Sequence, residues 1–296
     1  MNNKHLFSPG HTACAGCGQA VAARLVIDAA GANTIVANNT GCLEVFSTKY
    51  PESAWEVPWI HSLFENAAAV ASGIEAALIY LGKKENINVI AQGGDGGTAD
   101  IGLQALSGML ERGHDILYCC YDNEAYENTG IQRSGLTPYG TNTTTTPPGA
   151  ESIGNIRFKK PMPEIANAHA IPYVATASVG FAQDIQRKVK KALSIKGPKY
   201  LQIHVPCPLG WRHEPALTYQ VAKLAVESGL YPLIEYENGK LSAVRQIQPK
   251  PVEEYLKIQG RFKHLLNNPE EIKKIQDIAD NNIKKYNLKA ESQAGN

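Results

Sequence analysis

A single acidic residue, Asp95, stands inside a glycine-rich turn, residues 93–97 (GGDGG), directly after a β-leaning run over residues 88–92. Glycines at the end of a strand let the backbone approach an anionic group, and the N-terminus of a following helix favours a phosphate. Asp95 would repel that phosphate unless a cation lay between them. Magnesium takes oxygen ligands and bridges carboxylate to phosphate. The turn therefore predicts a magnesium–phosphate site, with a tight turn capped by Asp95 as the plainer alternative.

A second oxygen ligand for that cation is expected from Asn123, which lies 28 positions after Asp95 and follows the apolar strand expected over residues 116–121. Neighbouring parallel strands present their carboxyl ends at the same edge of a sheet, so the two side chains should meet. The GDG of residues 94–96, 26 intervening residues and then Asn123 resemble the thiamine-diphosphate motif, which begins GDG and ends in Asn. That resemblance implies that Asp95, Asn123 and the backbone carbonyl of Ala125 hold magnesium.

Four cysteines form a second group with chemical potential. Cys14 and Cys17 make a C-x-x-C pair just before a helix expected over residues 18–30. Cys42 and Cys207 each follow an expected strand, which places them at the same sheet edge as the predicted magnesium site. Four thiolates can hold a zinc ion or a [4Fe–4S] cluster. Zinc would only staple the N-terminus to the sheet, whereas a cluster would transfer electrons, and the residues alone leave both open.

The elements that must position these groups alternate along the first two-thirds of the chain. The remaining cysteines, Cys119 and Cys120, lie inside an apolar strand and are predicted to pack in the core. The alternation predicts an α/β fold with a doubly wound, mostly parallel sheet covered on both faces. The expected helices are 18–30, 65–81, 101–112, 163–170 and 182–195, and the expected strands are 34–38, 88–92, 116–121, 173–177 and 200–205. The alanine-rich helix over 65–81 is predicted to be buried.

Two segments break this alternation. Residues 137–154 are rich in Thr, Pro and Gly and predict a long loop, either a flexible surface excursion or a functional one. The composition turns charged from about residue 252. We expect one domain over residues 1–235 and a largely helical C-terminal extension over 236–296, with a frayed tail after Lys285.

Composition excludes several classes of protein. The 296 residues are 43% hydrophobic and 19% charged, with a net charge of +1, so neither disorder nor nucleic-acid binding is indicated. No apolar run reaches the length of a membrane span, and residues 1–5 (MNNKH) lack the apolar core of a signal peptide. A cytoplasmic protein is therefore expected, whose cysteines stay reduced or bind metal.

Further segments carry a closer resemblance, which extends to about residue 265. They are residues 11–18 (HTACAGCG), 39–42 (NTGC), 59–66 (WIHSLFEN), 121–132 (YDNEAYENTGIQ) and 206–211 (PCPLGW). Together they resemble the β subunit of pyruvate:ferredoxin oxidoreductase (pyruvate synthase), within the thiamine-diphosphate-binding 2-oxoacid:ferredoxin oxidoreductase family. The resemblance implies the thiamine-diphosphate-binding fold, with thiamine diphosphate and Mg²⁺ as cofactors. It also implies one [4Fe–4S] cluster, with Cys14, Cys17, Cys42 and Cys207 as ligands.

The same resemblance implies a set of cofactor and substrate contacts. His61 and Asn128 are expected to be catalytic, Asn128 through contact with the 2-oxoacid. A hydrogen-bonded core histidine and a turn residue are the plainer alternatives for these two. Relatives often carry a smaller or apolar residue where Glu127 stands, so only its backbone is expected to contribute. The expected cofactor contacts are Thr40, Gly41, Cys42, His61, Asp95, Gly96, Glu127, Asn128 and Thr129.

The implied reaction is the reversible, coenzyme A-dependent oxidative decarboxylation of pyruvate to acetyl-CoA and CO₂, with electrons passing through the cluster to ferredoxin. Branched-chain, aromatic and oxalate 2-oxoacids are alternative substrates. The alternative of another class is a non-catalytic electron-transfer subunit or a zinc-stapled scaffold, which leaves Asp95 and Asn123 without a task. Only one thiamine-type domain is found, so an α subunit with the pyrimidine-binding domain is expected as partner, beside γ and ferredoxin-like δ subunits. The chain is expected to be inactive alone.

Overall fold

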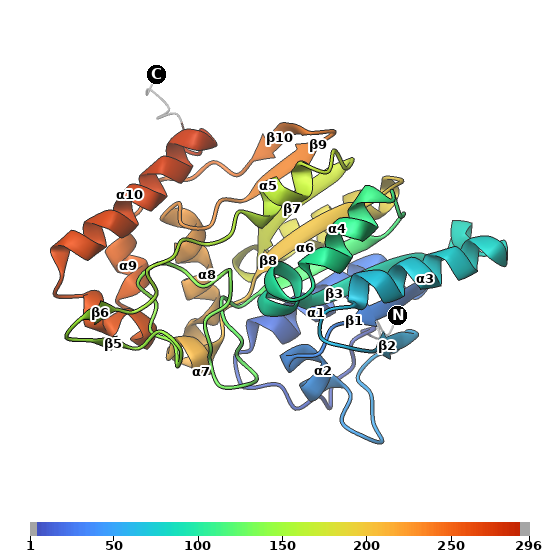
Figure 1. Cartoon of the computed structure of the whole chain (residues 1–296), viewed down its shortest axis with the longest axis horizontal. Helices are drawn as coiled ribbons and strands as arrows, with labels where there is room; N and C mark the ends of the chain where they lie inside the picture. Colours follow the sequence, from blue (N-terminus) through green and yellow to red (C-terminus); the bar gives the residue numbers. More distant parts are fainter. Residues whose placement is uncertain (1–4, 291–296) are drawn as a thin grey trace.

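An eight-stranded, mostly parallel sheet forms the centre of the computed structural model, which describes residues 5–290 (Figure 1). The strand order is β10-β9-β7-β8-β4-β3-β1-β2, and only β9 and β10 run antiparallel to their neighbours. The strands are β1 (Thr34–Asn38), β2 (Trp59–His61), β3 (Asn88–Gly94), β4 (Leu117–Asp122), β7 (Tyr173–Ser178), β8 (Lys199–His204), β9 (Ile234–Glu237) and β10 (Lys240–Val244). The predicted α/β class and parallel sheet are confirmed.

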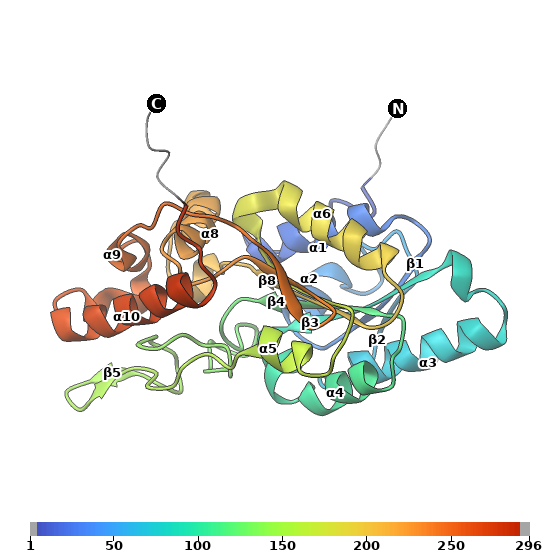
Figure 2. The same ribbon diagram turned by 90° about the horizontal axis from the view of Figure 1, so that it is seen from above.

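Helices cover both faces of this sheet, as Figure 2 shows from above. The helices α1 (Gly18–Ala30) and α6 (Ala182–Ser194) pack on one face, and α3 (Ala67–Tyr80), α4 (Leu103–Glu111) and α5 (Met162–Asn167) pack on the other. Because both faces are covered, the central strands β4, β7 and β8 are buried along their whole length. Cys119 and Cys120 on β4 are fully buried, which confirms their place in the core.

Helix α3 is less buried than its composition predicts. Its inner face packs against β1, β3 and α4. Its outer face leaves Ala69, Gly73 and Ala76 exposed, and at its end the side chains of Ile79 and Tyr80 are 60% and 90% exposed. The prediction of a buried helix therefore holds for the inner face and is wrong for the outer face, which is apolar but exposed in this chain.

The C-terminal region packs on the main sheet as a continuation of it. The boundary expected at residue 235 falls within β9, which pairs with β7. Helix α8 (Thr218–Glu227) precedes this boundary and shares one apolar core with the elements that follow it, which are α9 (Val252–Leu256), the 3₁₀ helix η5 (Gly260–Leu265) and α10 (Pro269–Lys285). Residues 286–290, expected to be frayed, are packed: Tyr286 and Leu288 are buried, and Ile247 pairs with Lys289. The rest of the expected tail, residues 291–296, lies outside the described residues.

The long loop over residues 137–154 is anchored at its base and exposed at its tip. Thr137, Thr141 and Thr143 are buried, and the backbone N–H of Asn142 donates to the carbonyl of Arg261 (3.1 Å). The tip forms a short hairpin of β5 (Pro148–Gly149) and β6 (Ser152–Ile153). A freely flexible excursion is therefore the wrong alternative for its first half. In the described part of the chain, no helix has the length and apolarity to cross a membrane.

Candidate active site

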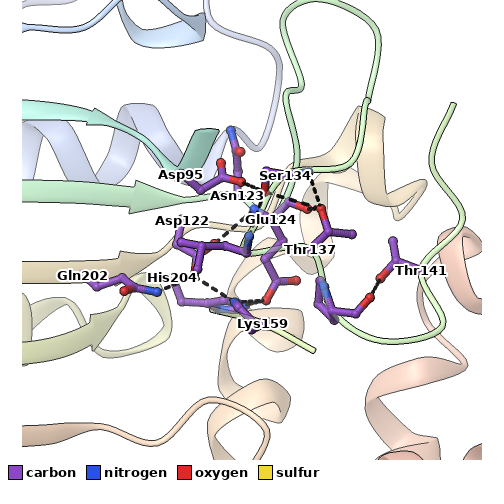
Figure 3. A network of polar contacts seen from close by, with 12 residues as sticks. Asp95, Asp122, Asn123, Glu124, Ser134, Thr137, Thr141, Lys159, Gln202 and His204 are labelled. Atoms are coloured by element: carbon purple, nitrogen blue, oxygen red, sulfur yellow. Dashed lines mark hydrogen bonds and ion pairs between the residues drawn. The ribbon is translucent and has the colours of Figure 1, made fainter. Parts of the chain in front are cut away.

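The edge where the parallel strands end brings the motif residues together. Gly94 of β3 pairs with Tyr121 of β4, so the turn that carries Asp95 lies beside the segment that carries Asn123 (Figure 3). With its NH₂ group turned inward, the Asn123 amide donates to Asp95 Oδ1 (2.7 Å) and to the carbonyl of Ala125 (2.9 Å). With Oδ1 turned inward instead, three oxygen atoms meet without a proton between them. The structure thus gathers the three groups that the motif names.

The Asp95 carboxylate is buried and has little positive charge near it. Its side chain is 1% exposed, and its Oδ2 accepts a hydrogen bond from Ser134 Oγ. Burial raises the pKa of Asp95 well above its ordinary value, and the negative charges of Asp122 and Glu127 raise it further. A buried, unpaired carboxylate is costly, so this group is suited to a bound cation.

A cavity of about 300 Å³ opens at this edge, beside Asp95 and Asn123. It contains nearly all of the expected cofactor contacts. Its walls include Thr40, Gly41, Cys42, Asp95, Gly96, Asn123, Ala125, Glu127, Asn128 and Thr129. His61, at the end of β2, is not part of the wall, but its Nε2 lies 2.7 Å from Thr40 Oγ1. Gly96 is needed for close packing, because a Cβ there would lie 2.2 Å from the Tyr126 ring.

Two buried side-chain oxygens on the cavity wall, Gln19 Oε1 and Glu127 Oε1, have no hydrogen-bond partner in the described residues. Burial raises the pKa of Glu127 to about 7, and the nearby Arg261 opposes that effect. The carboxyl of Glu127 presses against Gly210, where a Cβ would lie 1.8 Å from its Oε2. The side chain of Glu127 therefore points toward the Cys207 segment, whereas the sequence leads us to expect a cofactor contact from its backbone only. An unpartnered polar atom of a residue that lines a cavity, such as Gln19 Oε1, is consistent with a polar ligand there.

The four cysteines gather at the adjoining part of the same edge. The N–H of Gly18 donates to the carbonyl of Pro206 (3.2 Å), which brings the C-x-x-C segment against the Cys207 segment. Burial raises the pKa of the Cys17 and Cys207 thiols, and it raises the pKa of Cys42 to about 12. Neighbouring thiols of the group raise each of these pKa values further. Cys14 is exposed. Across residues 5–290, no three His, Cys, Asp or Glu side chains stand in a metal-holding arrangement.

Several residues around the site were missed from the sequence. Asn39 lines the cavity and accepts the N–H of Ala67 at the start of α3 (2.9 Å). The feature of the sequence that reflects its position is the pair Gly93 and Gly97. A Cβ at either glycine would lie within 2.8 Å of the Asn39 amide nitrogen, so the two glycines leave room for this side chain. Ser134, which supports Asp95, comes from a loop that gives no pattern of its own.

The fold and the cavity define a thiamine-diphosphate-binding enzyme domain. Residues 39–203 match the family model described as thiamine pyrophosphate enzyme, C-terminal TPP binding domain. The chain is 58% identical over 289 residues to pyruvate synthase subunit PorB of Methanosarcina barkeri, with 96% of this chain and 98% of the relative covered. It is 56% identical to the PorB of Methanocaldococcus jannaschii, with 95% of this chain and 96% of that relative covered.

This chain belongs to the PorB family of 2-oxoacid:ferredoxin oxidoreductase subunits, and it is therefore one subunit of a multi-subunit oxidoreductase. The chain is also 50% identical to a relative that is named for a different substrate. This relative is ketoisovalerate oxidoreductase subunit VorB of Pyrococcus abyssi, with 90% of this chain and 88% of the relative covered. Among solved structures, the 2-oxoglutarate:ferredoxin oxidoreductase of Magnetococcus marinus has the same fold. It matches with a TM-score of 0.59 and 22% identity, covering 75% of this chain and 80% of that chain.

Proposed function

We propose that this chain is the catalytic β subunit of a pyruvate:ferredoxin oxidoreductase. The enzyme would convert pyruvate and coenzyme A into acetyl-CoA and CO₂, reversibly, and pass two electrons to ferredoxin. The observation that carries this proposal is the identity of 58% along 96% of the chain to a pyruvate synthase subunit. The relation to VorB, at 50% identity, supports a branched-chain 2-oxoacid as the second candidate substrate.

Magnesium would be held by Asp95, by Asn123 with its Oδ1 turned inward, and by the carbonyl of Ala125. The Asn123 amide lies 2.7 Å and 2.9 Å from the other two oxygens. Neighbouring ligands of an octahedral Mg²⁺ with bonds of 2.0–2.1 Å lie about 2.9 Å apart, so the donor set and its spacing suit this ion. The raised pKa of Asp95 supports the same assignment, because a cation would compensate its buried charge.

The cavity would then hold thiamine diphosphate, whose thiazolium ylid, when bound, supplies the nucleophile and the electron sink for decarboxylation. Thr40, Gly41, Gly96 and Thr129 would line the cofactor. His61, expected to be catalytic and to contact the cofactor, would also hold Thr40 in place through its 2.7 Å contact. Asn128, exposed on the wall, would contact the 2-oxoacid.

The thiols of Cys14, Cys17, Cys42 and Cys207 would hold a [4Fe–4S] cluster beside this cavity. Support comes from their shared sheet edge and from their proximity, since neighbouring thiols of the group help to raise the pKa of Cys42 and of Cys207. The backbone N–H of Gly210 donates to Cys207 Sγ (3.4 Å), a bond of the kind that tunes cluster potentials. Zinc would suit the same four ligands but would accept no electrons, which a ferredoxin-linked reaction requires.

A separate α chain would complete the active site by supplying the carboxylate that activates the aminopyrimidine ring. Exposed apolar side chains follow the site residues on three segments: Val45 after Cys42, Leu63 after His61, and Leu209 after Cys207. A partner chain that covered them would exclude water from the cavity. We also expect γ and ferredoxin-like δ subunits in the complex, which would pass electrons on to ferredoxin.

The test is an anaerobic assay of the purified native complex against a panel of 2-oxoacids with coenzyme A and ferredoxin. The expected result is the highest kcat/KM with pyruvate. A higher kcat/KM with 2-oxoisovalerate would replace pyruvate by the branched-chain substrate. An absence of 2-oxoacid oxidation by an intact complex would contradict the proposed function.

A further inference from the structure

Glu124 stands between the two magnesium ligands that its segment supplies, and its backbone conformation is unusual. Its φ angle is +66°, in the left-handed region that a side chain such as glutamate seldom adopts. Its N–H donates to Asp122 Oδ1 (3.2 Å), and its carbonyl accepts from Thr137 Oγ1 (2.6 Å). Such a conformation persists only where the surroundings determine it, and here both backbone polar groups are held.

The Glu124 side chain is buried and holds two cations at once. Lys159 Nζ lies 2.7 Å from Oε1, and Arg261 Nη2 lies 2.6 Å from Oε2 (the Lys159 contact is drawn in Figure 3). Lys159 also pairs with Asp122 Oδ2 (2.8 Å), and the neutral His204 ring approaches Glu124 Oε1 to 3.8 Å. Burial alone would raise the pKa of Glu124, but Lys159 and Arg261 outweigh it and hold that pKa at about 2.

Arg261 comes from the C-terminal region, 137 residues away in the sequence. It is 1% exposed, and its guanidinium carbon lies 3.6 Å from the centre of the Trp211 ring. Trp211 in turn donates from Nε1 to the backbone carbonyl of Asn123 (2.8 Å). Arg261 therefore contacts the magnesium segment directly at Glu124 and, through the Trp211 ring, indirectly at Asn123.

We propose that Glu124 is the residue that positions the magnesium ligands: Lys159 and Arg261 lock its side chain, and the locked turn directs the Asn123 amide and the Ala125 carbonyl toward Asp95. This inference rests on the proposed function, since it takes these atoms to be ligands of the ion. Its consequence is that the C-terminal region, through Arg261, is part of the thiamine-diphosphate site. Loosening the turn should weaken metal binding even though Glu124 itself touches no ligand.

The matched control for this proposal is Glu235. It is also a buried carboxylate with two cation partners, Arg187 (2.6 Å) and Lys191 (2.8 Å), but it lies on β9. Both Glu124→Gln and Glu235→Gln should lower the thermal stability of the complex, because each removes the negative charge of a buried carboxylate that pairs with two cations. Only Glu124→Gln should change metal binding.

The experiment uses the complex freed of thiamine diphosphate and divalent metal, and titrates it with Mn²⁺ at a fixed thiamine diphosphate concentration. Free Mn²⁺ is measured by its room-temperature EPR signal. We expect Glu124→Gln to weaken Mn²⁺ binding about 10-fold to 100-fold, as is typical for groups that orient metal ligands. Glu235→Gln should bind as the parent does. Arg261→Lys, which keeps the charge, should lose less affinity than Arg261→Met and covers the case in which Glu124→Gln does not assemble.

An Asp95→Ala complex distinguishes an error in the magnesium site from an error in the positioning role of Glu124. Parent-like Mn²⁺ binding by Asp95→Ala would show that the magnesium site itself is misplaced. Loss of binding in Asp95→Ala together with parent-like binding in Glu124→Gln or Arg261→Met would overturn the positioning role and leave the proposed function standing. Equal losses in Glu124→Gln and Glu235→Gln would also overturn it, because the effect would then follow stability alone.

Discussion

The oxygen-rich and cysteine-rich parts of the same sheet edge differ in how completely the chain itself organises them. Asp95 is buried, accepts a hydrogen bond from Ser134 and contacts the Asn123 amide, so contacts within the chain hold these residues together. The cysteines include one exposed thiol and three partly exposed ones, and they do not form a metal-holding arrangement. The comparison indicates that hydrogen bonds connect the oxygen groups, and it predicts that the proposed cluster would bring the four thiols into their final places.

The largest effect is expected from Asp95→Ala, which removes the only carboxylate among the proposed magnesium ligands. Thiamine diphosphate content and activity should fall together. The loss should exceed about 100-fold, which is the largest loss typical of removing a group that only orients a metal ligand. Asn123→Ala should act in the same direction but less, because it removes a neutral ligand. Cofactor content after gel filtration and turnover measure both. An Asp95→Ala complex with parent cofactor content and turnover would refute a preorganised oxygen site.

Cys207→Ser should remove or degrade the cluster, because it takes away one of four thiolate ligands. The iron and sulfide content should fall from about four of each per chain, and the EPR signal of the reduced cluster should weaken or disappear. Cys119→Ser is the control, since Cys119 is fully buried in β4 and is not one of the four proposed ligands. A colourless parent protein with one zinc per chain, prepared without oxygen, would replace the cluster by a structural metal.

Removing each metal in turn sharpens the comparison directly. Stripping the cluster should increase amide hydrogen exchange in the segment around Cys14 and Cys17, because the metal organises it. Stripping Mg²⁺ and thiamine diphosphate should leave exchange around Asn123 and Glu124 nearly unchanged. The measurement is peptide-resolved exchange on the complex. Equal protection of the cysteine segment with and without the cluster would contradict the idea that metal binding organises it.

The smallest effect concerns Glu127. Burial raises its pKa from 4.5 to about 7 in the folded chain. A raised carboxyl pKa contributes stability below the unfolded value, and that contribution is lost as pH rises through the folded value. Glu127→Gln does not titrate, so its stability relative to the parent should increase between about pH 5 and pH 8, by at most about 3 kcal/mol. Thermal unfolding of the cluster-free subunit checks this, and a pH-independent difference would contradict the raised pKa.

The strands and their common edge could be predicted because a buried parallel sheet leaves continuous apolar runs in the sequence. The predicted runs 34–38 and 88–92 became β1 and the first part of β3, and the end of β3 beside β4 placed Asp95 next to Asn123. The exposed face of α3 could not be predicted, because an alanine-rich helix looks the same whether its neighbour belongs to its own chain or to another. The anchored base of the 137–154 loop depends on contacts with Arg261 that composition does not encode.

The residues that surround and support the site could not be predicted from the sequence either. Arg261 reaches Glu124 from the C-terminal region, and Gln19 presents an unpartnered oxygen at the start of α1. Both placements depend on how distant segments pack, and neither residue belongs to a local pattern. Glu127 was expected to contribute only its backbone, whereas its side chain lies beside the Cys207 segment.

The most direct test of the central claim is reconstitution of turnover from separate chains. The β chain, expressed anaerobically and supplied with iron and sulfide, is assayed with thiamine diphosphate, Mg²⁺, coenzyme A, pyruvate and ferredoxin, alone and with the α chain. We predict negligible turnover by the β chain alone, turnover after addition of the α chain, and none when the β chain carries Asp95→Ala. Substantial pyruvate oxidation by the β chain alone would contradict the account.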